Sequence, residues 1–296
     1  MTDKDTIVLG DFDNKTGDPI FDETLKTALS VSLNQSPFLN VLSDNKVGAA
    51  LKLMTLPPDT RLTPAVAREL CQRADSKDYI TGSIAGLGSH YVLGLKAVDC
   101  QSGDLLAQEQ ASAASKEKVL DTLGDTASKL RSQLGESLPS VRKFDVPLSE
   151  TTTSSLDALK AFSMAHAMMD QKGNVAAIPL LKRAIELDPN YAMAYGALSE
   201  NYFNLAQPAL QLEYATRAYQ LRDRASEREK LAISVNYFEA TGEIEKEAQT
   251  LEQWGATYPR DARRVNATLG NTYANMGQWD KPWQSIRKLQ QCSWTT

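Results

Sequence analysis

An apolar pattern that returns about every 35 residues constrains the fold of this chain more than any other feature. Tyr202, Phe238 and Tyr273 are spaced by 36 and 35 residues, and Met168 lies 34 residues before Tyr202. Glycines fall near each expected turn between helices: Gly173, Gly242 and Gly277. A helix pair that recurs at this period cannot bury its apolar face alone and has to stack on its neighbours. The sequence therefore predicts an all-α solenoid of about four helix pairs over residues 155–296, the last pair complete or truncated.

The residues around these positions follow the pattern of a tetratricopeptide repeat. Leu269, Gly270 and Tyr273 reproduce its small and aromatic positions. The first unit ends in the sequence of residues 184–189 and the third in that of residues 258–261, and each contains a proline that ends a second helix. The alternative interpretation of this half is an unrelated helical bundle.

The first half has a different pattern of predicted secondary structure, since short β-rich runs alternate with helical stretches up to about Ser137. A two-residue loop, Gly88-Ser89, separates two β-runs and predicts a hairpin in which Leu87 faces His90. We expect the order β-α-β-α-α-β-β-β-α, which is a mixed sheet with helices packed on it, in an α/β domain over residues 1–137. Two prolines and a Ser/Thr cluster predict a linker or an extended crossing segment over residues 138–154.

The charge balance narrows the classes of partner. The chain has 32 Lys and Arg against 37 Asp and Glu, a formal net charge of −5. Phosphate binding needs a surplus of Lys and Arg, so we expect no nucleic acid partner. No apolar run approaches the roughly 20 residues that span a bilayer, and the polar start lacks the apolar core of a signal peptide. We therefore expect no membrane insertion by this chain.

Several short stretches carry a resemblance to a known family. Residues 6–12 with residues 16–19 resemble the opening of TolB-like N-terminal domains. Together with four further stretches, they resemble the C-terminal, non-catalytic region of bacterial receptor-type serine/threonine protein kinases that carry tetratricopeptide repeats: residues 35–43, 82–84, 95–100 and 225–230. The resemblance implies a sensor or scaffold region, the input part of a signalling protein in which a kinase domain and one membrane helix precede it.

The catalytic motifs of a kinase are absent from this sequence. Neither His90 nor His166 is followed by Arg-Asp, and Asp11-Phe12-Asp13 has the wrong third residue for the kinase metal motif. No Cys/His cluster has metal-ligand spacing, and the acidic stretch from Asp11 does not match a calcium loop. We expect no catalytic residue, no metal and no cofactor.

The hairpin register brings two cysteines near each other. If Asp78 faces about Asp99, then Cys71, near the end of the preceding helix, becomes a neighbour of Cys100. A disulfide closing the loop between them would add about 3 kcal/mol of stability. Two separate buried thiols are the equal alternative. The resemblance implies an extracytoplasmic location, which permits oxidation, whereas a free-standing chain would be cytoplasmic with reduced thiols.

The inner face of the repeats is the best candidate binding surface. In this fold the first helix of each pair lines a concave face, and its ninth position points inward. These inward positions, with their neighbours, predict a polar groove that hydrogen-bonds an extended protein or peptide ligand: His166, Glu200, Asn236, Asn271, Phe162, Glu239, Arg264 and Asn275. The set lacks the lysines that clamp a C-terminal carboxylate. The alternative is a solvated concave face with no specific ligand.

A second hypothesis gives the function to the first half. Loops at the strand ends around residues 13–19 would bind a small molecule, with the repeats serving for oligomerisation. A third reading, an enzyme, is disfavoured because no catalytic constellation is found. The last unit has Pro282 at a position that starts a helix. Either partly exposed Trp279, Trp283 and Trp294 promote a homo-oligomer, or the natural protein continues beyond them. Cys292 is expected to be unpaired.

Overall fold

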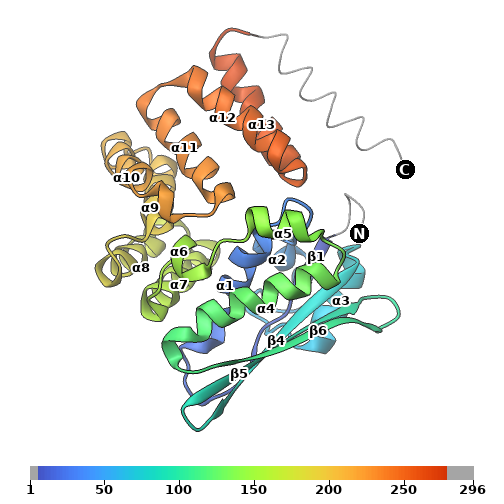
Figure 1. Cartoon of the computed structure of the whole chain (residues 1–296). Coiled ribbons are helices and arrows are strands. Elements are labelled where there is room, and N and C mark those ends of the chain that lie inside the picture. The colour runs from blue at the N-terminus through green and yellow to red at the C-terminus, as the bar shows by residue number, and fades with distance from the viewer. Residues whose placement is uncertain (1–5, 279–296) are drawn as a thin grey trace. The chain divides into compact units, whose positions relative to one another are not determined.

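The computed structural model describes residues 6–278 and divides the chain into two compact units, Met1–Pro189 and Asn190–Thr296. The first unit contains a mixed sheet and the second is helical (Figure 1). Our expectations for Trp279, Pro282, Trp283, Cys292 and Trp294 lie outside the described residues.

The sheet of the first unit has the strand order β3-β1-β4-β5-β6, and β2 pairs with β4 beside this path. The strands are β1 (Thr6–Leu9), β2 (Asp13–Lys15), β3 (Asn40–Val41), β4 (Asp78–Leu87), β5 (His90–Asp99) and β6 (Leu105–Ala113). β1 runs parallel to β3 and β4, while β4, β5 and β6 form an antiparallel meander. The sheet is therefore mixed, as the sequence predicts.

The helices of this sheet follow from caps and apolar spacing. They are α1 (Phe21–Asn34), α2 (Asp44–Leu53), α3 (Pro64–Arg73) and α4 (Val119–Gln133), the last preceded by a short 3-10 helix, Lys116–Lys118. The Thr63 side chain accepts a hydrogen bond from the Val66 amide, and Pro64 takes the first helical position. α4 packs on β5 and β6, whereas α3 packs on β1 and β4.

The hairpin register is confirmed. Leu87 pairs with His90 and Asp78 with Asp99, so β4 and β5 face each other along their whole length. Alternate side chains, including Ile80, Leu93 and Leu95, are fully or almost fully buried on one face. The opposite face is also covered near β1, where Val8 and Tyr79 are buried in a second apolar cluster with residues of α2 and α3.

β2 corrects one expectation, because the sequence predicts only a turn over residues 13–19. Asp13–Lys15 instead forms a three-residue strand that pairs in parallel with residues 83–85 of β4. Its residues are polar and mostly exposed, so no apolar alternation marks it as a strand. The pairing arises from a partner that lies about 70 residues away in the sequence.

Residues 138–154 also differ from the extended segment that their composition indicates. They contain α5 (Leu138–Phe144) and α6 (Leu148–Thr151), and the Leu148 side chain is fully buried against Gly124 of α4. The Gln35 side-chain amide pairs with both main-chain groups of Val146, at 2.8 and 3.0 Å. Proline at the second position of α5 starts the helix rather than breaking it.

A buried ion cluster holds this segment on α4. Arg131 is fully buried and donates two hydrogen bonds of 2.9 Å to the Glu136 carboxylate, and its guanidinium lies 3.5 Å from Asp145. Ser140 donates to Glu136 and Ser128 donates to Asp145. Although burial raises the pKa of Glu136, hydrogen bonding and charge from Arg131 leave it below its ordinary value. The segment is therefore fastened to the sheet unit.

The remaining helices form consecutive pairs. The first pair, α7 (Leu156–Lys172) and α8 (Asn174–Leu187), belongs to the sheet unit, where Ser163 of α7 bonds to Thr27 of α1. The second unit contains α9 (Ala192–Asn204) with α10 (Pro208–Gln220), α11 (Glu227–Thr241) with α12 (Ile244–Thr257), and α13 (Ala262–Asn275). α7 packs on α8, and within the second unit each helix from α9 to α13 packs on the next.

Residues 225–230, one of the stretches on which the family resemblance rests, make a set of hydrogen bonds at the start of α11. Ser226 and Glu229 form a capping box at the start of α11. Arg228 donates two hydrogen bonds, of 2.7 and 2.8 Å, to Asp261, and the Trp254 indole donates to the same carboxylate. This stretch therefore ties α11 to the residues before α13.

We predict that Gly82→Ala destabilises the protein by about 1–3 kcal/mol, because overpacking a tight core forces its neighbours to shift. A Cβ at Gly82 would lie only 2.4 Å from carbons of the Phe12 ring. Gly86→Ala, on the same strand, is the control, since nothing lies within 4 Å of its Cβ position. Urea unfolding of both variants measures the difference, and equal midpoints would contradict the prediction.

We predict that Glu136→Gln lowers the free energy of unfolding by about 3–5 kcal/mol, because it leaves the buried Arg131 charge without its main partner. The pKa of Glu136 is lowered in the folded state, so its contribution is present above the unfolded pKa and lost as pH falls through the folded pKa. The difference from wild type should therefore shrink in acid. Glu69→Gln, in the exposed pair with Arg73, is the control and should cost about 0–1 kcal/mol.

Candidate functional site

The second unit carries six of the residues that the repeat pattern predicts to line a concave face, and we call this set the inner face. It comprises Glu200 on α9, Asn236 and Glu239 on α11, and Arg264, Asn271 and Asn275 on α13. All are exposed except Asn236, which is half-buried. Among the described residues, no hydrogen bond or ion pair engages the Asn236, Glu239 or Asn271 side chains. The side-chain amides of Asn236 and Asn271 can therefore hydrogen-bond the main chain of a bound segment.

Three carboxylates come together at this face. Partial desolvation, followed by the nearby Glu247 and Glu200 carboxylates, raises the pKa of Glu239 above its ordinary value. Glu247 itself is only 8% exposed, and its carboxylate accepts a 2.7 Å hydrogen bond from the buried Thr272 hydroxyl. Burial raises the pKa of Glu247, against the lowering effect of that bond. A cation approaching this place would meet negative charge from α9, α11 and α12.

Glu247 and Thr272 are the residues that sequence reasoning missed. Glu247 lies on α12, the second helix of its pair, where the repeat pattern predicts no inward position. A glutamate on a helix ordinarily indicates a solvated surface, so the sequence carried no signal for its burial.

Two of the predicted groove residues, Phe162 and His166, lie on α7 in the other compact unit. Phe162 is 6% exposed, so it is a core residue of α7 rather than a ligand-facing one. Its ring makes an edge contact with the exposed His166 ring, with centroids 4.5 Å apart. His166 is therefore packed from one side by its own helix.

Arg264 is engaged by an aromatic ring. Its guanidinium lies 5.8 Å from the centroid of the Trp254 ring, and Trp254 in turn bonds to Asp261. This cation–π contact directs Arg264 toward the α12–α13 connection. Arg264 is thus the positive group of the inner face, and Glu200 and Glu239 are its carboxylates.

The loop that follows β1 is occupied with its own contacts. Asn14 donates to the Asp18 carbonyl and the Asp22 carboxylate, and its oxygen accepts bonds from Thr16. Lys116 pairs with Asp18 at 2.6 Å and, by hydrogen bonding, lowers its pKa. Within residues 6–278 no group of three His, Cys, Asp or Glu side chains is placed to hold a metal ion.

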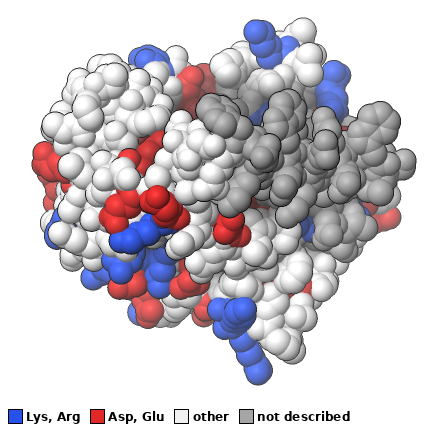
Figure 2. All heavy atoms as spheres, turned by 90° about the horizontal axis from the view of Figure 1, so that it is seen from above, with Lys and Arg blue, Asp and Glu red and all other residues white. Residues whose placement is uncertain are grey.

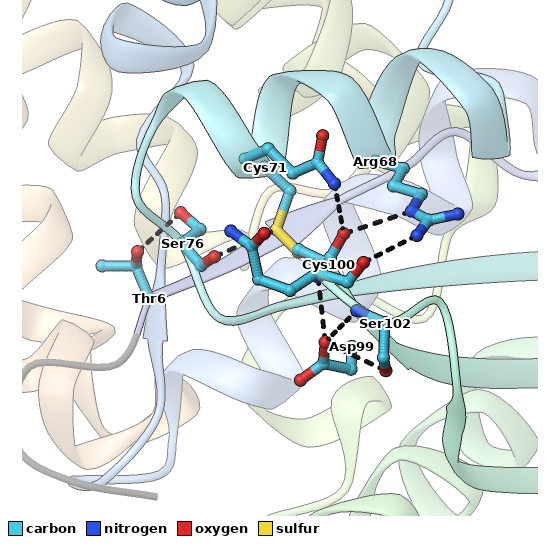
Figure 3. The surroundings of a disulfide bond; sticks show 9 residues. Thr6, Arg68, Cys71, Ser76, Asp99, Cys100 and Ser102 are labelled. Carbon is cyan, nitrogen blue, oxygen red and sulfur yellow. Dashed lines mark hydrogen bonds between the residues drawn. A yellow bond between two sulfur atoms is a disulfide. The ribbon is translucent and has the colours of Figure 1, made fainter.

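Cys71 and Cys100 are joined by a disulfide, with their Cα atoms 5.9 Å apart (Figure 3). Both side chains are fully buried. Arg68 and Gln72 of α3 donate hydrogen bonds to the Cys100 carbonyl, at 3.1 and 2.7 Å. Asp99 accepts two main-chain bonds in the following turn, and the bond from Ser102 is the largest cause that lowers its pKa. The disulfide therefore links α3 to the turn between β5 and β6.

Neither sign of charge dominates the face that Figure 2 shows, in keeping with the similar numbers of basic and acidic residues in the sequence. On the face in Figure 2, basic and acidic side chains lie interspersed among larger areas of other residues. No helix among the described residues is both long and apolar enough to cross a bilayer.

The chain matches no protein-family model, and no curated protein matches it. Similar solved structures include the LpoB C-terminal domain from Salmonella enterica, 15% identical with a TM-score of 0.35 over 38% of this chain and 84% of that chain. Lipoprotein GNA1162 from Neisseria meningitidis is 18% identical with a TM-score of 0.33 over 45% and 98%. The MamA MSR-1 structure is 13% identical with a TM-score of 0.34 over 57% and 88%. At these scores the likenesses assign neither a fold nor a function.

We predict that the double variant Cys71→Ala with Cys100→Ala unfolds with a free energy about 2–4 kcal/mol lower than the oxidised wild type. The reason is that the bond closes a loop across a sequence separation of 29 residues. Urea unfolding with and without dithiothreitol measures the effect. The reductant should shift the wild type toward the double variant and leave the double variant unchanged; a wild type unaffected by reductant would refute the bond's contribution.

Proposed function

We propose that this chain is a non-enzymatic scaffold or sensor region that binds an extended protein segment on its inner face, and that its helix pairs are tetratricopeptide repeats. The observation that carries the proposal is that the half-buried Asn236 of α11 and the exposed Asn271 of α13 make no side-chain hydrogen bond with the described residues. Such amides fit the alternating donors and acceptors of an extended backbone.

The carboxylates suggest the chemistry of the partner. Glu200 and Glu239 have no ion-pair partner among residues 6–278, and Glu247 is nearly buried beside them. A Lys or Arg side chain of a bound segment would supply the missing positive charge at a place where solvent screening is reduced. We therefore propose a ligand segment that carries basic residues.

We predict that Asn236→Ala with Asn271→Ala weakens binding of a basic peptide about thirtyfold, because one hydrogen bond worth roughly 1 kcal/mol is lost at each position. The probes are fluorescent peptides of one length, Lys/Arg-rich, neutral and Glu-rich, measured by anisotropy against the full chain. The basic peptide should bind best, and the far-UV circular dichroism of the variant should match that of wild type.

Gln249→Ala with Gln253→Ala is the matched control, because it removes two exposed amides from α12 that lie outside the inner face. This control should bind the basic peptide as wild type does. If the Asn236/Asn271 variant also binds unchanged, or if the Glu-rich peptide binds as well as the basic one, the proposal is wrong.

The finer role, as the input part of a bacterial serine/threonine kinase signalling protein, is proposed from the resemblance of the sequence stretches alone. Its test is the genomic reading frame upstream of Met1. A frame that continues through a membrane helix and a kinase domain would support the receptor role and an extracytoplasmic location. A stop codon followed by a ribosome-binding site would instead support a free-standing cytoplasmic adaptor.

A further inference from the structure

Glu247 on α12 differs from the other carboxylates at the inner face because it is nearly buried. It is only 8% exposed, whereas Glu200 and Glu239 are exposed. Its Oε1 atom accepts a hydrogen bond from the Thr272 hydroxyl of α13, and within residues 6–278 its Oε2 atom accepts none. No Lys or Arg of that part of the chain pairs with it. Ionisation of this carboxyl group therefore has a cost, because neither water nor a positive charge replaces its full hydration.

The hydroxyl beside Glu247 suits both protonation states of the carboxyl group. Thr272 Oγ1 lies 2.7 Å from Glu247 Oε1 and 3.0 Å from the Thr268 carbonyl oxygen, so its single hydrogen can serve either acceptor. When Glu247 is ionised, the hydroxyl donates to the carboxylate. When Glu247 is protonated, the acid can donate to Thr272 Oγ1 while the hydroxyl donates to the Thr268 carbonyl. The site thus keeps its hydrogen bonds when a proton is added.

The charged groups on the elements around Glu247 do not compensate its charge. α12 packs against α11, α13 and the 3-10 turn Pro259–Asp261. On α11 the neighbouring group is the Glu239 carboxylate, which in turn lies near Glu200 of α9. Cations on these elements have other partners: Lys246 with Glu243, Lys230 with Glu227, Arg228 with Asp261, and Arg264 with the Trp254 ring. Burial accordingly raises the pKa of Glu247, and burial followed by the nearby carboxylates raises that of Glu239.

We propose that Glu247 makes binding at the inner face dependent on pH: in its ionised form it receives a Lys or Arg side chain of the basic segment, and on protonation it releases that side chain. This inference rests on the function proposed above, since it names the residue of that site that responds to pH. A cation stabilises the ionised carboxylate and a proton neutralises it, so the two compete. Affinity is then full above the raised pKa of Glu247 in the free protein and falls as the pH drops through that pKa.

The test follows binding of a fluorescent Lys/Arg peptide to the full chain by anisotropy as a function of pH. The peptide has blocked ends and no other titratable residue. Between about pH 8 and about pH 5 the peptide stays charged, and an ordinary glutamate, with a pKa of about 4.3, stays mostly ionised. We expect the affinity of wild type to fall about tenfold or more toward the acid end, because a charge-assisted hydrogen bond to the peptide is lost.

Glu247→Gln identifies the group that takes up the proton. Its amide oxygen can still accept the Thr272 bond, but the side chain does not titrate, so the affinity of this variant should be low and nearly constant over the range. Glu245→Gln is the matched control, because it makes the same substitution at an exposed position of the same helix. The control should keep the affinity and the pH dependence of wild type, and far-UV circular dichroism at both ends of the range checks that each variant is folded.

Calorimetry of wild type provides a readout that depends on no variant. Binding enthalpies in two buffers with different ionisation enthalpies give the number of protons released per peptide, which should match the slope of affinity against pH. Equal affinity of wild type at both ends of the range overturns this inference and leaves the proposed function in place. A pH dependence that survives in Glu247→Gln assigns the proton to another group and overturns the inference as well. Absence of peptide binding at every pH overturns the proposed function and this inference together.

Discussion

The two-residue turn at Gly88-Ser89 sets the register on which most of the first unit depends. A slip of one residue in the pairing of β4 with β5 would exchange every side chain between the two faces of the sheet. The observed register directs Ile80, Leu93 and Leu95 into the core. It also places Asp78 opposite Asp99, and so brings Cys100 to the end of α3 that carries Cys71. The disulfide is thus a consequence of hairpin geometry rather than its cause.

A second constraint acts where the sheet meets the helices that follow it. Arg131 is fully buried, and such a charge is tolerated only when its partners are held in place. Glu136, Asp145 and the serines that bond to them provide those partners, and all lie within one short stretch of chain. The stretch therefore cannot leave the sheet unit without exposing an uncompensated guanidinium. The first helix pair is joined to the same unit by separate contacts, among them the hydrogen bond from Ser163 of α7 to Thr27 of α1.

Local patterns were enough to predict some parts of this fold and not others. The hairpin and the cap at Thr63 follow from two or three neighbouring residues, and both could be predicted from the sequence. β2 could not, because its three polar residues become a strand only through β4, far along the chain. The helices at 138–154 were missed for a related reason, since the composition of that stretch does not reveal its ion pairs with a buried arginine. At the inner face, the repeat period predicts inward positions for Asn236 and Asn271 but carries no signal for Glu247, whose carboxylate is buried against Thr272 of α13.

The inner face holds the carboxylate of Glu247, which is both buried and hydrogen-bonded by a neutral group. Burial of Glu247 disfavours its charge, and the Thr272 hydroxyl that donates a hydrogen bond to its carboxylate is neutral. Protonation relieves part of this cost at low pH, whereas a cationic partner would relieve it at neutral pH, when the carboxylates are ionised. Binding of a basic segment should then lower the pKa of both Glu239 and Glu247.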